Sequence, residues 1–174
     1  TRRARLTGIK PATAGTRMLR RMAAPACSAP RWPTAPELPA GHPCALCRER
    51  AGSPCAALDA DSLAQLRSGA RDLQLQAGQS LYRQDNAADA LYLLRAGLLR
   101  LTVRDAEGRE QVLAFRGPGA LVGLTAQARH RHGAEAVLPS RLCRWPGSAA
   151  ALVERHPALA APLLRAALDA LDGA

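Results

Sequence analysis

Four of the five cysteines in this chain are spaced like the ligands of a metal centre. Cys44 and Cys47 form a Cys-Ala-Leu-Cys pair, Cys55 follows after a loop of seven residues, and Cys143 lies far downstream near the end of an expected strand. A pair with this spacing presents two thiolates from adjacent turns of backbone, and the distant cysteine would tie the loop to a folded domain. The pattern predicts a redox or gas sensor that binds an iron–sulfur cluster. A single zinc ion is the alternative, with Cys143 or His42 as its fourth ligand.

Cysteine usage and hydropathy both indicate a cytoplasmic protein. Five cysteines in an oxidising compartment would form disulfides and leave one over, whereas the same spacing in a reducing cytosol favours metal ligation. No apolar run approaches the roughly 18 residues that span a bilayer, and residues 22–30 are too weakly apolar for a signal-peptide core. We therefore expect no membrane contact, and no role for Cys27.

The positive charge is concentrated at the N-terminus. The chain of 174 residues has a formal net charge of +10, and residues 1–50 carry ten of its 24 Lys and Arg residues but only two of its 14 acidic residues. A basic arm can contact phosphates of nucleic acid. Six prolines and little periodic hydrophobicity in residues 1–40 favour a disordered arm or a misassigned upstream extension, with Met18 or Met22 as the true start.

The residues after the cysteine loop predict a short helix followed by a strand-rich region. Leu63 and Leu66 share one helical face, and Asp59 or Asp61 is a suitable N-cap. Short alternating or apolar runs separated by glycines then predict about eight strands, with a hairpin turn over residues 105–108. The runs are 73–76, 80–82, 90–94, 98–103, 111–115, 121–122, 134–138 and 141–143. Strands at this spacing are typical of a jelly roll or a sandwich.

The chain returns to helix after the strands. Residues 147–155 predict a short helix, and Pro157 is placed to open a second one. The second helix has an apolar stripe of Leu159, Leu163, Leu164, Leu168 and Leu171. This stripe predicts pairing with a second copy of the chain, or packing back onto the strands. Pro162, six residues into the expected helix, predicts a kink.

Three segments of the strand-rich region carry a family pattern: Ala77-Gly-Gln-Ser-Leu-Tyr, Ala90-Leu-Tyr-Leu-Leu-Arg-Ala-Gly-Leu-Leu-Arg, and Gly119-Ala-Leu-Val-Gly-Leu. Together they resemble the cyclic-nucleotide-binding-like sensor domain of the Crp/Fnr transcription regulators, over about residues 44–171. Within that superfamily, the Cys44-x2-Cys47-x7-Cys55 loop and Cys143 in Arg141-Leu-Cys-Arg-Trp-Pro are similar to the Fnr branch. The resemblance implies an oxygen-labile 4Fe–4S cluster held by these four cysteines, with the seven-residue gap matching longer-spaced variants.

The resemblance also implies a mechanism. A bound cluster would order the loop against the barrel beside Cys143 and favour a homodimer through residues 157–174, whereas oxygen would destroy the cluster, release the loop and weaken the dimer. These regulators continue into a winged helix-turn-helix, but this sequence ends at Ala174, so we expect DNA binding only if that domain is supplied. Arg48, Arg50 and Arg144 could offset the anionic cluster and lower the thiolate pKa values, or could be solvated.

Cyclic-nucleotide binding is a competing function because the fold is shared. Nucleotide-binding members hold the ribose with a Gly-Glu-Leu turn, and here the corresponding turn is Gly123-Leu-Thr. They hold the phosphate with an arginine that precedes a small residue, whereas Arg129 and Arg131 alternate with histidines. The run of residues 129–132 predicts an exposed loop, with a further metal or phosphate site as the alternative.

No motif supports catalysis: the sequence lacks a Gly-x-Ser-x-Gly elbow, a Gly-Lys-Ser/Thr phosphate loop and a His-Glu-x-x-His pair. We expect no enzyme activity and no small-molecule substrate. A regulatory chain without its DNA-binding half could pair with a complete relative as a dominant-negative partner, and a truncated fragment of an ordinary regulator is the alternative.

The predicted architecture is mainly β with flanking helices: a double-stranded β-helix jelly roll followed by a dimerisation helix. The predicted boundaries are a disordered arm over 1–40, a cysteine loop over 41–57, a sensor domain over 58–156 and the start of the dimer helix over 157–174.

Overall fold

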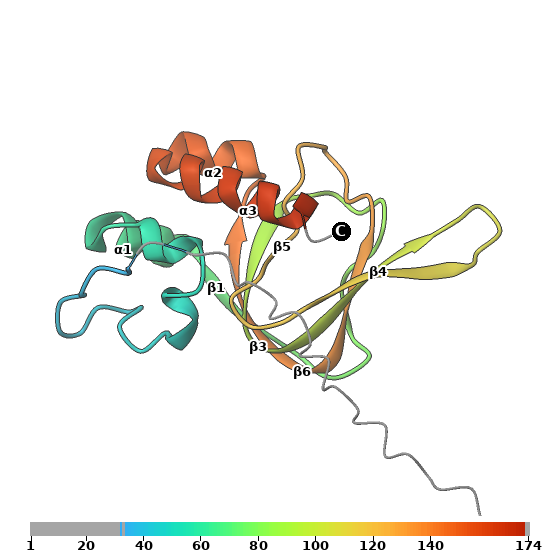
Figure 1. The fold of residues 1–174 in the computed structure, drawn as a ribbon, viewed down its shortest axis with the longest axis horizontal. Coiled ribbons are helices and arrows are strands. Elements are labelled where there is room, and N and C mark those ends of the chain that lie inside the picture. Colours follow the sequence, from blue (N-terminus) through green and yellow to red (C-terminus); the bar gives the residue numbers. More distant parts are fainter. Residues whose placement is uncertain (1–31, 33, 173–174) are drawn as a thin grey trace, which may run out of the picture.

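The computed structural model describes residue 32 and residues 34–172, which form a rolled antiparallel sheet with helices packed at one end (Figure 1). The strands are β1 (Arg71–Leu75), β2 (Ser80–Tyr82), β3 (Ala90–Arg104), β4 (Glu110–Arg116), β5 (Leu121–Val122) and β6 (Gly133–Pro146). Their order is β1-β6-β3-β4, β2 also pairs with β6, and β5 also pairs with β3. The mainly β architecture with flanking helices is therefore confirmed. Residues 1–31 of the predicted arm, Cys27 among them, lie outside the described residues.

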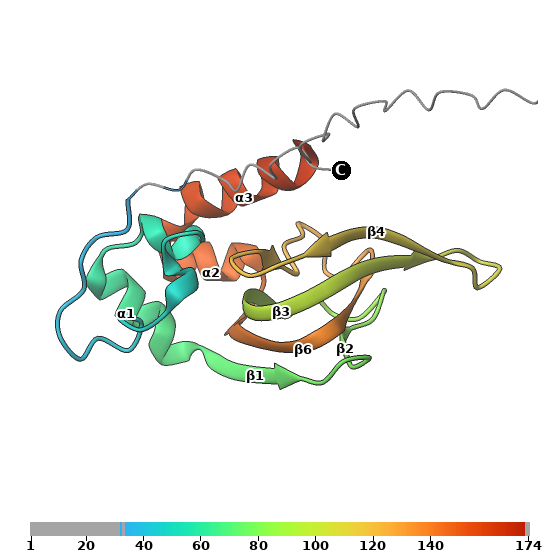
Figure 2. The ribbon, with the colours of Figure 1, turned by 60° about the horizontal axis from the view of Figure 1, so that its bottom comes forward.

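The helices gather at the end of the sheet that carries the cysteine loop. They are α1 (Ala60–Gly69), α2 (Ala149–Arg155) and α3 (Ala160–Asp172), with single 3-10 turns η1 (Arg48–Arg50), η2 (Pro54–Ala57) and η3 (Pro157–Leu159). Figure 2 shows the loop with α1 and α2 at one end of the molecule and the β3–β4 hairpin at the other. No helix in the described part of the chain is long and apolar enough to cross a membrane.

The first helix forms as its local sequence predicts. The Asp59 carboxylate accepts the backbone N–H of Ser62 at 2.7 Å, which satisfies one of the free N–H groups of the first turn. Leu63 and Leu66 are almost fully buried. They pack in one core cluster with Trp145 and with two of the cysteines, so the helix is attached directly to the region that the cysteines occupy.

Six strands replace the eight that the sequence predicts, because β3 and β6 each run through an expected break. Gly97 lies inside β3, and the β3–β6 pairing continues past it with register shifts on both sides. Its φ is +99°, and a Cβ there would lie 2.5 Å from the carbonyl oxygen of Pro139. The glycine therefore permits a bulge where two backbones approach closely, rather than a turn. The predicted hairpin turn over residues 105–108 is confirmed between β3 and β4.

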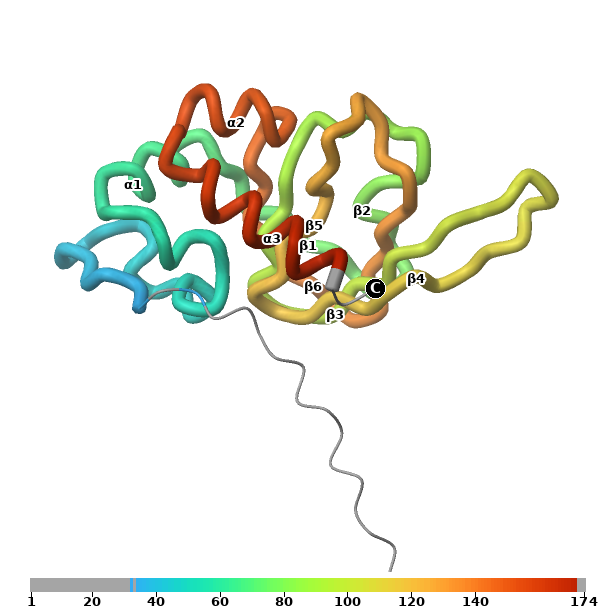
Figure 3. The backbone as a smooth tube through the Cα atoms, turned by 45° about the horizontal axis from the view of Figure 1, so that its top comes forward, coloured from blue at the N-terminus to red at the C-terminus, as the bar shows by residue number. Residues whose placement is uncertain are grey.

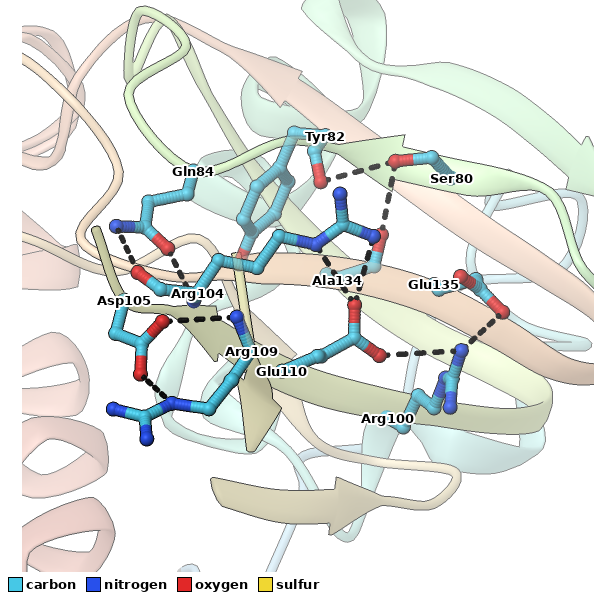
Figure 4. A network of polar contacts seen from close by, with 10 residues as sticks. All are labelled: Ser80, Tyr82, Gln84, Arg100, Arg104, Asp105, Arg109, Glu110, Ala134 and Glu135. Atoms are coloured by element: carbon cyan, nitrogen blue, oxygen red, sulfur yellow. Dashed lines mark hydrogen bonds and ion pairs between the residues drawn. The ribbon is translucent and has the colours of Figure 1, made fainter. Parts of the chain in front are cut away.

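Ion pairs join the outer surfaces of β3, β4 and β6 near this hairpin (Figure 4). Arg100 lies opposite Glu135 in the register and contacts it at 3.1 Å, and it also contacts Glu110 at 3.5 Å. Arg104 lies opposite Glu110 and contacts it at 3.0 Å. Opposite charges directly across neighbouring strands favour this register over a shifted one.

The C-terminal helices differ in one respect from the prediction. The α-helix begins at Ala160, after the 3-10 turn at Pro157–Leu159, so Pro162 is its third residue. The first residues of a helix have no carbonyl partner for their N–H groups, so a proline there costs no hydrogen bond. The expected kink at Pro162 is therefore wrong.

The apolar stripe of α3 is divided between the core and the surface. Leu159 and Leu163 are buried against the rest of the chain, whereas Leu164 is 62%, Leu168 53% and Leu171 73% exposed. The helix thus packs back on its own sheet with one edge and leaves the other edge uncovered within the described residues. Packing back onto the chain is therefore confirmed for Leu159 and Leu163, and pairing with a second copy stays a prediction for the exposed leucines.

Candidate metal centre

The loop that carries Cys44, Cys47 and Cys55 is built from successive tight turns. The backbone N–H of Cys47 donates to the carbonyl of Cys44 at 3.1 Å, and the N–H of Arg50 donates to the carbonyl of Cys47 at 3.3 Å. The Ser53 hydroxyl then donates to the carbonyl of Arg50 at 3.1 Å. Each turn folds the chain back on itself, so the loop stays compact around its cysteines (Figure 3).

His42 attaches this loop to α1. Its Nδ1 accepts the backbone N–H of Cys44 at 3.0 Å, so Nδ1 carries no proton, and Nε2 donates to the carbonyl of Ala60 at 3.0 Å. Both ring nitrogens are thus engaged with backbone. The alternative of His42 as a zinc ligand does not fit this arrangement, because a ligand needs a ring nitrogen free for the metal.

The strand β6 places Cys143 beside the loop. In the register, Cys143 lies opposite Asp72 of β1 on one side and opposite Leu93 of β3 on the other. Cys143 and Cys55 are both buried and belong to the same core cluster, and the half-buried Cys44 packs against that cluster. The structure therefore places Cys143 in the same part of the core as Cys55 and Cys44, which are distant from it in the chain. Cys47 is partly exposed and does not belong to this cluster.

The four thiols influence one another electrostatically. Burial, followed by the neighbouring Cys47 and Cys143, raises the pKa of Cys44. Burial raises the pKa of Cys55 to about 12, with a partly offsetting hydrogen bond from Ser53, and the other three cysteines raise it further. Burial also raises the pKa of Cys143, against a hydrogen bond from Trp145 and the charge of Arg67. Without a cation between them these groups are neutral thiols, and a bound metal would favour the thiolates.

None of these four cysteines forms a disulfide. Within residues 32 and 34–172, no three His, Cys, Asp or Glu side chains form a group that could hold a metal ion. Four thiolates on one zinc ion lie about 3.8 Å apart, since each Zn–S bond is about 2.3 Å long in a tetrahedron. An iron–sulfur cluster has several metal atoms and separates its thiolates further. The four cysteines fit an iron–sulfur cluster in their donor chemistry, because thiolates are the ligands that such clusters use.

Two arginines that the sequence analysis did not select lie next to these thiols. The Arg67 guanidinium is 3.8 Å from Sγ of Cys143, and Arg67 and Arg95 both act on the pKa of Cys44 by lowering it. Of the arginines chosen for being adjacent to cysteines in sequence, Arg48 is exposed and Arg144 contacts Asp89 at 3.4 Å. Arg50 has a buried Nη1 with no hydrogen-bond partner among the described residues.

A groove of about 1300 Å³ separates β5 and the following loop from α3. Its lining is mostly apolar, with Arg116, His132, Asp89 and Glu154 as its ionisable residues. Arg129, which was weighed as a phosphate ligand, instead donates to the backbone carbonyl of Asp85 at 2.6 Å. Neither Arg129 nor Arg131 lines this groove, whose lining includes Arg116, so a cyclic phosphate there would have to pair with a different arginine.

The expected exposed loop over residues 129–132 is wrong at His130. His130 is 3% exposed, and its ring stacks on Tyr82 with the centroids 3.7 Å apart. Burial, followed by the neighbouring His132, lowers the pKa of His130. The histidine is therefore a buried residue that packs on β2.

Comparison with known proteins matches a large part of this chain to a known domain family. Residues 72–153 match the family model described as "Cyclic nucleotide-binding domain". The nitrogen fixation regulation protein FixK of Bradyrhizobium diazoefficiens is 27% identical over 107 residues, which cover 62% of this chain and 45% of FixK. The patatin-like phospholipase domain-containing protein 7 of Rattus norvegicus is 30% identical over 87 residues, which cover 48% of this chain and 6% of that protein.

A solved structure agrees with these relatives. The catabolite activator protein of Thermus thermophilus superposes with a TM-score of 0.56 and 26% identity, over 67% of this chain and 56% of that chain. The chain spans less than half of the length of the curated relatives described above. The match to the phospholipase protein covers only a small part of it, so what is common to all of them is the regulatory domain.

Proposed function

The chain belongs to the Crp/Fnr superfamily through its cyclic nucleotide-binding domain, and from this we propose that it is the sensor part of a transcription regulator whose ligand is an oxygen-labile 4Fe–4S cluster. Cys44, Cys47, Cys55 and Cys143 would hold the cluster. The observation that carries the proposal is that Cys55 of the loop and Cys143 of β6 lie in one core cluster, against which Cys44 packs.

When bound, the cluster would supply a centre that reacts with oxygen. The chain's own residues then determine what the reaction changes. The loop is attached to α1 through His42, and Cys55 packs in the same core cluster as Leu159 and Leu163 near the start of α3. Release of the cysteines would therefore loosen the packing around the base of α3.

The uncovered edge of α3 supports a homodimer as the output of the sensor. Leu164, Leu168 and Leu171 repeat at intervals of three or four residues, so they lie along one side of the helix and could pack against a second copy. A full-length regulator would use this dimer to bind two half-sites of DNA. We expect the cytoplasm as its location, since thiols remain reduced there.

An absorption spectrum of the protein purified without oxygen tests the proposal. We expect a broad band at about 400 nm, as thiolate-bound clusters show, and its loss on exposure to air. Cys143→Ala should lack the band from the start, whereas Cys27→Ala should keep it. A colourless protein with one zinc ion per chain would overturn the proposal in favour of a structural zinc module.

A separate titration tests the competing ligand. Cyclic AMP or cyclic GMP added to the metal-free chain should leave the thermal unfolding midpoint unchanged, because no arginine is free for the phosphate at residue 129. A concentration-dependent rise in the midpoint would favour nucleotide binding in the groove beside α3.

A further inference from the structure

Arg67 contacts the cysteine that is farthest from it in sequence. It lies in the last turn of α1, and its Nη1 is 3.8 Å from Sγ of Cys143, 76 positions away. Its side chain is only 25% exposed, so its charge is screened less than that of a surface arginine. The contact is therefore a charge-assisted hydrogen bond to a sulfur atom in a partly dry environment.

A second contact fixes the position of this guanidinium. Nη2 of Arg67 lies 2.7 Å from a carboxylate oxygen of Asp72, whose other oxygen lies 3.0 Å from Nη1 of Arg95. Asp72 is directly opposite Cys143 in the β1–β6 register, so both side chains belong to the same face of the sheet. The strand pairing itself thus places the anchor of Arg67 next to the thiol.

The charges around Cys143 do not cancel. Two arginines share one carboxylate, which leaves one net positive charge beside the thiols. A cluster held by four thiolates is anionic, and both its net charge and the hydrogen bonds to its sulfurs set its reduction potential. A cation beside the ligand sulfur makes removal of an electron from the cluster less favourable.

We propose that Arg67, held by Asp72, sets the oxygen sensitivity of the centre by placing a positive charge on the sulfur of Cys143. This inference rests on the proposed function, because it concerns the same site. In the step concerned, one electron passes from the cluster to dioxygen, which becomes superoxide, and no bond to the protein forms or breaks. Arg67 opposes this transfer and so raises the oxygen exposure that the sensor requires before it responds.

The test compares bleaching in air and reduction potential among variants of the anaerobically purified protein. Arg67→Gln should bleach about fivefold faster than the wild type, because it loses a charge-assisted hydrogen bond to sulfur, and its reduction potential should be lower. Arg67→Lys keeps the charge but lacks the planar guanidinium. Its bleaching rate and reduction potential should lie between those of the wild type and those of Arg67→Gln.

Arg83→Gln is the matched control. Arg83 is exposed and directly follows β2, which pairs with the beginning of β6 near Gly133. Cys143 lies near the opposite end of β6. Arg83→Gln removes the same charge from the chain and should bleach at the wild-type rate. If the reduction potential of the cluster changes in Arg67→Gln and not in Arg83→Gln, the effect is local to the site. A purely structural role of Arg67 would not produce this change of reduction potential.

The outcomes separate this inference from the proposed function. If the wild type binds no cluster, both fail. If the wild type binds a cluster and Arg67→Gln has the same bleaching rate and potential, this inference alone is overturned. If Arg67→Gln assembles no cluster, Arg67→Lys decides. A bleaching rate at or slightly above that of the wild type supports the inference because the charge is kept, and a rate more than about fivefold above the wild type contradicts it.

Discussion

His42 joins Cys44 to α1 through a single imidazole ring. One ring nitrogen accepts the N–H of Cys44 and the other donates to the carbonyl of Ala60, each at 3.0 Å. Since His42 precedes the first cysteine by two residues, it fixes the start of the loop before any ligand is bound. A loop that is positioned in advance loses less conformational entropy when it closes around a metal centre.

Replacing His42 by alanine should loosen the cysteine loop without unfolding the sheet. Two hydrogen bonds are lost, which corresponds to about 1–2 kcal/mol of unfolding free energy. Hydrogen–deuterium exchange of the metal-free chain should become faster in residues 42–47 and remain unchanged in β3. His156→Ala is the control, because the buried Nδ1 of His156 has no hydrogen-bond partner among the described residues. Equal exchange in both variants would show that His42 does not hold the loop.

The buried thiol of Cys55 should make the metal-free chain less stable in alkali. The pKa of Cys55 is about 12 in the folded chain because of burial, against 9.0 as the ordinary value. The unfolded chain therefore loses its proton first, so the stabilisation is complete below pH 9 and declines as the pH rises toward 12. Near pH 10.5 the loss from this group is about 2 kcal/mol.

Denaturant titrations of the metal-free chain at pH 8 and near pH 10.5 measure this effect. Cys55→Ala should show a smaller decline between the two pH values, because the variant has no ionisable group at that position. Cys44 and Cys143 also have raised pKa values and contribute in the same direction. An identical decline in the wild type and in Cys55→Ala would contradict the assignment of the effect to burial of this thiol.

Gly97 should tolerate no side chain. A Cβ at this position would overlap the side chain of Ser140 and lie 2.5 Å from the carbonyl oxygen of Pro139, at a φ of +99°. Gly97→Ala is expected to cost more than about 3 kcal/mol of unfolding free energy, since both strain and overlap apply. Gly108→Ala, at φ +81° in open space, should cost only about 1–2 kcal/mol. Urea denaturation of both variants distinguishes overlap from backbone strain.

The exposed leucines of α3 should control self-association. Leu164→Glu and Leu168→Glu place a charge on the uncovered edge and should weaken a dimer at least about tenfold in sedimentation velocity, while the fold is kept. Asp169→Lys, at an exposed position on another side of the same helix, should have no such effect. Leu163→Glu should instead unfold the chain, because Leu163 is only 4% exposed. A wild type that sediments as a monomer at all concentrations would contradict the dimer.

Local patterns predicted the parts of the fold that depend on neighbouring residues. The N-cap at Asp59, the buried face of Leu63 and Leu66, and the hairpin before Arg109 all follow from contacts within a few positions. The number of strands does not follow from local contacts. Gly97 and Pro139 resemble turn signals, and only the pairing of β3 with β6 continues the strands past them. Propensity is a weak predictor wherever such non-local pairing decides.

The residues of the candidate site also fall into two groups, those that a local sequence pattern selects and those that only the packing of distant elements brings there. The cysteines can be selected from the sequence because metal ligands are restricted to few residue types and characteristic spacings, and their role as ligands stays a prediction. Arg67 cannot be selected in this way, because its contact with Cys143 depends on how α1 and β1 pack beside β6. Adjacency in sequence favours Arg144 as the arginine beside the Cys143 thiol. Neighbouring residues of a strand point to opposite faces, however, and Arg144 contacts Asp89. His130 was misjudged for a similar reason, since its partner Tyr82 lies on β2.

The metal content of the anaerobically purified chain tests the central claim most directly. Iron, inorganic sulfide and zinc are determined per chain for the wild type and for single alanine variants at Cys27, Cys44, Cys47, Cys55 and Cys143. The account predicts about four iron and four sulfide in the wild type and in Cys27→Ala, and their loss in the other four variants. One zinc ion per chain without sulfide, or a cluster that survives Cys143→Ala, would contradict it.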